Sequence, residues 1–563
     1  MRATFTLSLC LAFLGAAPVH AADVTFERLV NPEPQNWLTN HHDYAAQRYS
    51  ALSAINKTNV KGLRLAFAVA LGGASGNENL TATPLVDDGY MYMTDAWGVV
   101  YKIDVRSGQQ GDIVWKMDPG QEKMDRNRGV ALWGNLVIST TSNDGRVIAT
   151  DRDTGKMVWE RNLKDQPDIT LNAAPLALKD SVIIPASGGD SGARSWLTAL
   201  DARTGNVLWK TYAVPAPGEP GSETWKDKHN AWQTGGGAFY VTGSYDPDTN
   251  ITYWGAGNPA PKYDSSYRPG DNLYTNSALA IDAATGKIRW YHQYTPNDTM
   301  DYDESGSHIL IDTKVNGEDR KIVTRAARNG FAYSFDRLSG QFLKATPYVS
   351  KVTWTRGIDP KTGKPLDYDP AKDLQTYADP IGKILTGETS SFCPGVPGGN
   401  NFWSAAYSLR TSLLYIPELE ACTSVTRDQT AHVRGRFDGG KFAYDGRGLS
   451  GLVVLDPATG EVKKRKEMPY PNAAGALATA GGLIVTALLD GTIVALDDET
   501  LEELWSINVG TGINAHPITY AVDGKQYIAI ATGLTRNQIG RIANSPELKN
   551  LAKNATMLFV FGL

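Results

Sequence analysis

A recurring hairpin pattern constrains the fold of this chain more than any other feature. In each copy a strand of alternating residues ends at an aspartate, a turn of the form Asp-x-x-Thr-Gly follows, and a tryptophan stands on the next strand. The glycine can adopt the positive φ that such a tight turn requires. Four copies keep the same aspartate-to-tryptophan spacing, and they begin at Asp151, Asp201, Asp282 and Asp497. Looser copies begin at Asp104, Asp336 and Asp456.

These hairpins predict an all-β fold in which the copies stack on one another, because a single hairpin cannot bury its own apolar face. The long gap between Asp336 and Asp456 leaves room for one more unit, and Tyr407–Pro417 is the candidate. Seven visible units and this one predict an eight-bladed β-propeller with tryptophan-docking repeats, a ring that leaves few open sheet edges. An array of β-sandwiches is the alternative.

The N-terminus has the organisation of a secretory signal peptide. Arg2 supplies the positive start, an apolar run extends from Leu7 to Ala17, and Val19-His20-Ala21 offers a small-residue cleavage site. The run is too short to span a membrane, and no later stretch reaches the length that a span requires. We therefore expect residues 1–21 to be removed and residues 22–563 to be exported as a single domain without a membrane span.

Charge and cysteine content exclude several other classes. The formal net charge is −5 and the sequence pI is about 6.0, so nothing indicates nucleic-acid binding or a basic membrane surface. Cys10 belongs to the signal peptide. Cys393 and Cys422 would most simply form one disulfide in an oxidising compartment, and two buried thiols are the alternative. No Gly-x-Gly-x-x-Gly opens a βαβ unit, so no nicotinamide site is expected.

Several longer motifs follow one another in a specific order along the chain. They are residues 36–38 (NWL), 255–261 (GAGNPAP), 268–272 (RPGDN), 295–303 (TPNDTMDYD), 328–331 (RNGF) and 477–481 (LATAG). Each is weak alone, but together they resemble the PQQ-dependent alcohol dehydrogenases, the quinoproteins of the methanol/ethanol group, over essentially the whole mature chain. The resemblance implies a periplasmic enzyme that passes hydride from an alcohol to PQQ and yields an aldehyde or ketone. Because no Cys-x-x-Cys-His occurs, electrons would leave to a separate acceptor, expected to be a cytochrome c.

The same resemblance implies roles for individual residues. Asp301 stands where the family keeps its catalytic base, and Arg328 matches the cation beside the reacting quinone carbonyl. The remaining PQQ contacts would be Arg128, Asn172, Ser187, Gly188, Gly189, Tyr240 and Asn401. For the metal, the implied ligands are Asp190, Asn258, Asp301 and Asp303, hard oxygen donors that suit a hard cation.

The choice of metal stays open between a lanthanide and calcium. An acid at position 303 resembles the lanthanide-type enzymes, whereas calcium-type relatives usually carry a small residue there. A solvated Asp303 is the alternative, and it would favour calcium. Asp190 replaces a glutamate of the family and is one methylene shorter.

Other positions depart from the family. Its adjacent cysteine pair is absent, and its aromatic floor tryptophan is replaced by Tyr240. Two tryptophans of the substrate pocket are replaced by Lys262 and Ala473. Because indoles are large walls, these changes predict a roomier pocket for a bulky primary or secondary alcohol, unless neighbouring loops fill the space. Two further alternatives are a propeller that serves as a non-catalytic scaffold and a quinoprotein that acts on aldehydes, amines or sugars.

Overall fold

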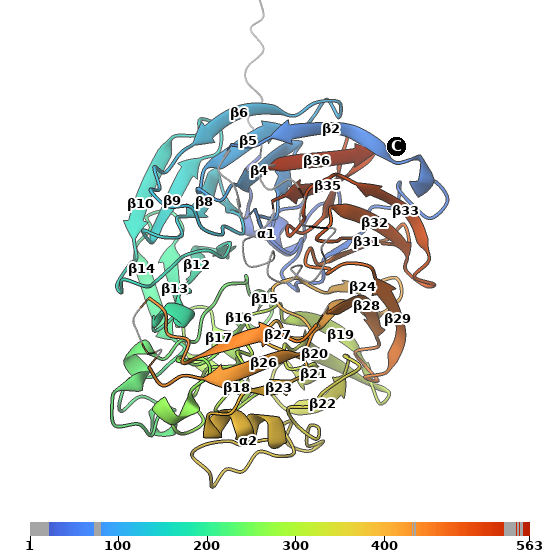
Figure 1. The fold of residues 1–563 in the computed structure, drawn as a ribbon. Helices are drawn as coiled ribbons and strands as arrows, with labels where there is room; N and C mark the ends of the chain where they lie inside the picture. Colours follow the sequence, from blue (N-terminus) through green and yellow to red (C-terminus); the bar gives the residue numbers. More distant parts are fainter. Residues whose placement is uncertain are drawn as a thin grey trace, which may run out of the picture.

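The computed structural model describes residues 22–72, 80–430, 432, 435–446, 448–533, 548, 551 and 556–563. The expected signal peptide at 1–21 lies outside this part of the chain. The described residues form mainly short strands, and Figure 1 shows their sheets arranged around a ring. Two α-helices occur among them, α1 (Phe26–Val30) and α2 (Asp379–Thr386). The predicted all-β propeller class is confirmed.

Eight sheets of the described residues contain four or five strands each. The first four are β3 (Leu85–Asp87), β4 (Tyr90–Thr94), β5 (Val100–Asp104) and β6 (Asp112–Met117); β7 (Ala131–Trp133), β8 (Leu136–Thr140), β9 (Arg146–Asp151) and β10 (Met157–Asn162); β11 (Leu176–Ala177), β12 (Ser181–Pro185), β13 (Trp196–Asp201) and β14 (Val207–Tyr212); β15 (Ser244–Asp246), β16 (Ile251–Gly255), β17 (Ser277–Asp282) and β18 (Ile288–Gln293).

The next four sheets continue along the chain. They are β19 (Ile309–Val315), β20 (Glu318–Ala326), β21 (Phe331–Asp336) and β22 (Phe342–Pro347); β24 (Ala406–Ser408), β25 (Leu413–Glu420), β28 (Leu449–Leu455) and β29 (Val462–Met468); β1 (Tyr49–Ser50), β30 (Ala476–Thr479), β31 (Leu483–Ala487), β32 (Thr492–Asp497) and β33 (Glu503–Asn508); β2 (Arg64–Ala70), β34 (Ile518–Val522), β35 (Lys525–Thr532) and β36 (Met557–Gly562).

The repeated turn links several of the sheets to their neighbours. Asp151 Oδ1 accepts hydrogen bonds from the backbone N and the Oγ1 of Thr154, at 2.8 and 2.7 Å. The tryptophan of the preceding sheet, Trp115, donates its indole N–H to the carbonyl of Arg152 at 3.1 Å. Its ring lies against Gly155, where an added Cβ would meet the indole at 2.8 Å. The glycine is therefore required both for its positive φ and for contact with the tryptophan.

The same indole-to-carbonyl bond recurs around the ring. The pairs are Trp159 to Ala202, Trp209 to Ala283 and Trp290 to Arg337. Strand β29 carries no tryptophan, and the turn that follows on the next sheet has Leu501 in the glycine's place. Leu501 adopts a φ of 63° and belongs to the same buried cluster as Met468 of β29. A side chain fits there because no indole covers the turn.

One detail of the predicted repeat is wrong. Tyr407–Pro417 is not a separate unit, because β25 pairs with β28, the strand that leads into the Asp456 turn. The last sheet is instead made from the two ends of the chain, where β2 pairs antiparallel with β36. Trp505 docks on this sheet through the carbonyl of Leu63, at 3.2 Å. The two ends share no repeat motif, so the pattern could not identify this sheet.

A small additional sheet fills the long gap instead. It contains β23 (Ser390–Phe392), β26 (Thr423–Arg427) and β27 (Gly440–Tyr444). Val425 of β26 packs in one buried cluster with Tyr253 and Tyr263, so this sheet covers the loops that follow β16. The predicted disulfide between Cys393 and Cys422 is present and joins the ends of β23 and β26.

Replacing Trp209 with alanine should destabilise the protein by about 3–5 kcal/mol. The side chain is only 9% exposed, and it loses both the bond to Ala283 and the contact with Gly286. Urea unfolding followed by tryptophan fluorescence would measure this change. Leu208 is the matched control, because it lies next to Trp209 on β14 and is 54% exposed. Its replacement by alanine should change stability by no more than about 0.5 kcal/mol, and equal losses would contradict a docking role.

Candidate active site

A cavity of about 720 Å³ opens where several inter-strand loops meet. Its wall is built by the loops after β12, β16 and β18, by the turn between β20 and β21, and by residues of β27. The predicted site residues that line it are Arg128, Asn172, Ser187, Gly188, Gly189, Asp190, Tyr240, Lys262, Asp301, Asp303, Arg328 and Asn401. The fold thus brings together side chains from loops far apart in the sequence.

Two of the predicted site residues, Asn258 and Ala473, do not line the cavity. Asn258 contacts two residues that do: its backbone N–H donates to Asp303 Oδ1 at 2.9 Å, and its side-chain amide lies 3.5 Å from Asp190 Oδ1. Ala473 does not line the cavity but is buried in an apolar cluster with Phe402 and Trp403. The small side chain of Ala473 therefore does not enlarge the cavity, contrary to the prediction.

Asp301 is held in a sharp turn at the cavity wall. Its φ of 63° is unusual for a residue with a side chain, and such conformations persist only where neighbouring contacts enforce them. Asp298 supplies these contacts by accepting hydrogen bonds from the backbone N–H groups of Met300 and Tyr302, both at 2.9 Å. Asp301 Oδ1 is buried without a hydrogen-bond partner among the described residues. That oxygen is free to accept a proton or to bind a cation.

Burial makes the Asp301 carboxylate a better proton acceptor than an aspartate in water. Burial raises the pKa of its carboxyl well above the usual value, and the neighbouring acids Asp190 and Asp303 add to this effect. The ammonium of Lys262 and the guanidinium of Arg328 oppose it. A carboxylate whose pKa is raised in this way binds a proton more tightly than one in water.

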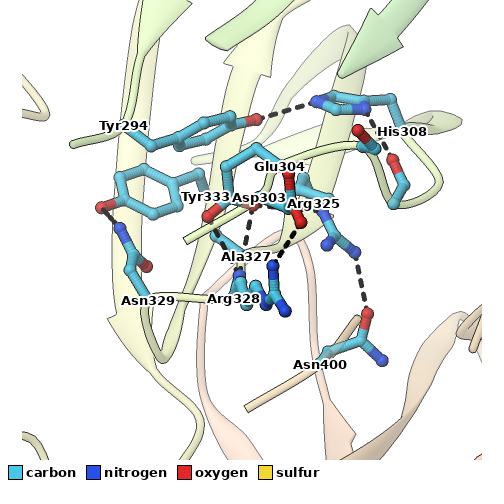
Figure 2. Close-up of polar contacts among 12 residues, drawn as sticks. Tyr294, Asp303, Glu304, His308, Arg325, Ala327, Arg328, Asn329, Tyr333 and Asn400 are labelled. Carbon is cyan, nitrogen blue, oxygen red and sulfur yellow. Dashed lines mark hydrogen bonds and ion pairs between the residues drawn. The ribbon is translucent and has the colours of Figure 1, made fainter. Parts of the chain in front are cut away.

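Arg328 is fixed by two acids that follow each other in the sequence (Figure 2). Its Nη1 lies 2.5 Å from Asp303 Oδ2, and its backbone N–H donates to both oxygens of Glu304, at 3.0 and 3.1 Å. Glu304 is fully buried and lies 3.5 Å from the guanidinium of Arg325, which in turn donates to Asn400. Burial raises the pKa of Glu304 to about 7, although Arg325 opposes the shift. The guanidinium of Arg328 therefore has a defined position at the cavity wall.

Both oxygens of Asp303 are engaged by this network, one by Arg328 and the other by the backbone of Asn258. The sequence motifs predict no role for Glu304, although it directly follows Asp303 in an acidic run. Asp438 has no recognisable signal in the sequence.

Another group of lining residues, around Arg128, suits a planar anion. Arg128 is 6% exposed and its Nε has no hydrogen-bond partner among the described residues. Its guanidinium lies 5.3 Å from the Tyr240 ring and 5.2 Å from the Phe402 ring. The buried side-chain oxygen of Asn172 is also unpartnered. Burial lowers the pKa of Arg128 to about 10, and a bound carboxylate would stabilise the charged form.

Lys262 extends into the acidic side of the cavity. Its Nζ lies 2.9 Å from Asp438 Oδ1, 3.4 Å from Asp190 Oδ2 and 3.9 Å from Asp301 Oδ2. Burial opposes its charge, but the acids around it hold the pKa of the ammonium well above its usual value. The same cation, together with Arg328, lowers the pKa of Asp190, whose side chain is 56% exposed.

Comparisons with known proteins show the family of this chain. The family described as "Glucose/ethanol/alcohol dehydrogenase, beta-propeller domain" (PQQ) matches residues 37–347 and 452–528. The chain belongs to this family of PQQ-dependent alcohol dehydrogenases. One relative is the quinoprotein alcohol dehydrogenase PedH of Pseudomonas putida, 34% identical with 94% of this chain and 92% of the relative covered. Another is the quinohemoprotein alcohol dehydrogenase of Comamonas testosteroni, also 34% identical, with 92% of this chain and 75% of the relative covered.

A solved structure shows the same similarity. A europium-containing methanol dehydrogenase superposes with a TM-score of 0.86 at 29% identity, and 96% of this chain and the whole of that chain are covered. The cavity of this chain offers groups that suit the cofactor: a buried arginine, Arg128, whose Nε is unpartnered among the described residues, aromatic rings beside it, and the unpartnered side-chain oxygen of Asn172. Carboxylate and amide oxygens also suit a hard cation, and Oδ2 of Asp190 and of Asp301 already face one cation, the Lys262 ammonium, at 3.4 and 3.9 Å. Among the described residues, no helix is long and apolar enough to cross a membrane.

Proposed function

We propose that this chain is a periplasmic quinoprotein dehydrogenase that oxidises a bulky primary or secondary alcohol to an aldehyde or ketone and passes electrons to a separate cytochrome c. The observation that carries this proposal is the free, buried oxygen of Asp301 in a cavity bordered by Arg328 and Arg128. Family membership supports alcohol oxidation by a quinoprotein. The substrate class, acceptor and compartment are our proposals.

In this proposal the protein's own groups position the substrate and move its proton. Asp301 Oδ1 accepts the proton of the alcohol hydroxyl, and burial strengthens it as a base. Arg328 places a fixed positive charge where negative charge develops, because its guanidinium is held by Asp303. PQQ, when bound, supplies the two-electron acceptor.

The cofactor would be held by other residues that line the cavity. Arg128 would pair with a carboxylate of PQQ, and Tyr240 would offer a ring face to its planar system. The other contacts are Asn172, Ser187, Gly188, Gly189 and Asn401. Asp190, Asn258 and Asp301 would hold the metal, which supplies a Lewis acid; Asp303 would join them only by releasing one of its present partners.

The domain organisation is also part of the proposal. Residues 22–563 would form one exported domain after removal of residues 1–21. The eight sheets with four or five strands would be the blades of one closed ring, closed by β2 and β36. Such a closed ring accounts for a rigid cavity built from loops of several blades.

Reconstitution tests this proposed function. Protein depleted of metal would be supplied with PQQ and either calcium or lanthanum, and dye reduction would be followed with alcohols from methanol to sterol-sized compounds. We expect PQQ-dependent turnover, with the highest kcat/KM for a bulky alcohol. Methanol as the best substrate would contradict the proposed substrate class. Faster turnover of aldehydes than of the matching alcohols would contradict alcohol oxidation, and failure to bind PQQ would indicate a non-catalytic propeller.

A further inference from the structure

We propose that the Lys262 ammonium is a built-in cation at the metal position and that it weakens the binding of calcium or a lanthanide by this chain. The inference rests on the proposed function only in its assignment of Asp190 and Asp301 as metal ligands. It concerns Lys262, which stands where the resembled family has a tryptophan of the substrate pocket.

The position of the ammonium carries the inference. Nζ lies 3.4 Å from Asp190 and 3.9 Å from Asp301, the two acids expected to bind the metal. A cation bound by both would have to approach each carboxylate to about 2.3–2.6 Å. It would then lie close to Nζ and be repelled by it. A metal ion and the lysine therefore compete for the same two carboxylates.

A third acid keeps the lysine in place. Asp438 lies 2.9 Å from Nζ, and its own backbone carbonyl accepts a hydrogen bond from the backbone N–H of Tyr263, the residue after Lys262. The preceding residue, Phe437, donates its backbone N–H to the carbonyl of Asp190. The segment with Asp438 is thus tied to both loops that border the site. This arrangement is a fixed part of the cavity wall.

Three carboxylates face the ammonium, at 2.9 Å (Asp438), 3.4 Å (Asp190) and 3.9 Å (Asp301). Its charge therefore offsets the repulsion that these acids would otherwise exert on one another.

The site acids are also more widely spread than a preformed metal cluster. Among the described residues, three acids whose ligand oxygens all lie within 4.8 Å of one another occur at Asp497, Asp498 and Glu499, and not at the cavity. The cavity acids instead surround two fixed cations, Lys262 and Arg328. Removing the lysine charge would leave the site more negative, and the gain should be larger for a trivalent ion than for a divalent ion.

Metal titration of the PQQ-loaded protein tests this inference. Terbium binding would be followed by its luminescence and calcium binding by calorimetry, in wild type and in Lys262→Met. We expect Lys262→Met to bind terbium at least about 100-fold more tightly than wild type, because one unit charge is removed next to the site. The gain for calcium should be smaller. Equal terbium affinities in the two proteins would overturn the inference.

Two controls separate the possible failures. Lys210→Met removes a lysine paired with Asp165 away from the cavity, and its metal affinity should equal that of wild type. PQQ binding, followed by absorbance in each protein, reports on the proposed function independently of metal. If Lys262→Met does not fold, Lys262→Gln provides the same loss of charge with a polar side chain, and the same gain is expected.

Discussion

Replacing Asp301 with asparagine should lower kcat by about 10²- to 10⁴-fold while PQQ binding changes little. The amide has nearly the same shape as the carboxylate, so the cavity is preserved, but it cannot accept the hydroxyl proton. The unpartnered Oδ1 of Asp301 makes this the group best placed for that transfer. Steady-state dye reduction with a saturating alcohol would measure kcat, and absorbance would measure PQQ binding.

Asp125 offers the matched control for this variant. It also lines the cavity, but no role in the reaction is proposed for it. Asp125→Asn should therefore keep kcat near that of wild type. An unchanged kcat in Asp301→Asn, with PQQ bound, would show that another group takes the proton.

The replacement Arg328→Met should lower kcat by about 10²- to 10³-fold, the cost of removing one preorganised donor at a site of developing negative charge. It should also destabilise the fold by about 3–5 kcal/mol, because Asp303 is left as a buried and unpaired charge. Urea unfolding would measure the stability change, and dye reduction would measure kcat.

The double variant Asp303→Asn with Arg328→Met separates these two effects. It removes both members of the ion pair, so much of the lost stability should return. Activity should stay low, since the guanidinium is still absent. Recovery of activity in the double variant would mean that Arg328 acts only by neutralising Asp303.

Local sequence was sufficient for the fold class, whereas the cavity residues were predicted from the resemblance to a known family. The aspartate turn, its glycine and the tryptophan lie within one hairpin, and the hydrogen bonds of Asp151 and Trp115 explain why that spacing recurs. The family motifs then identified the residues that meet at the cavity, from Arg128 to Asn401. The predicted extra space at Ala473 is not found, because Ala473 does not line the cavity and belongs to a buried cluster with Phe402 and Trp403.

The sequence by itself determined the repeating hairpins, because each depends on neighbouring residues. It also determined the disulfide pair, because only two cysteines follow residue 21. The side chains that line the cavity were predicted from family motifs that follow one another in order. Only the tertiary structure decided how the ring closes and what Lys262 contacts. Strands β2 and β36 come from opposite ends of the chain, and Lys262 meets Asp190 and Asp438 from two other loops. Pairings between distant segments depend on where the whole fold places them, and no short-range pattern encodes that position.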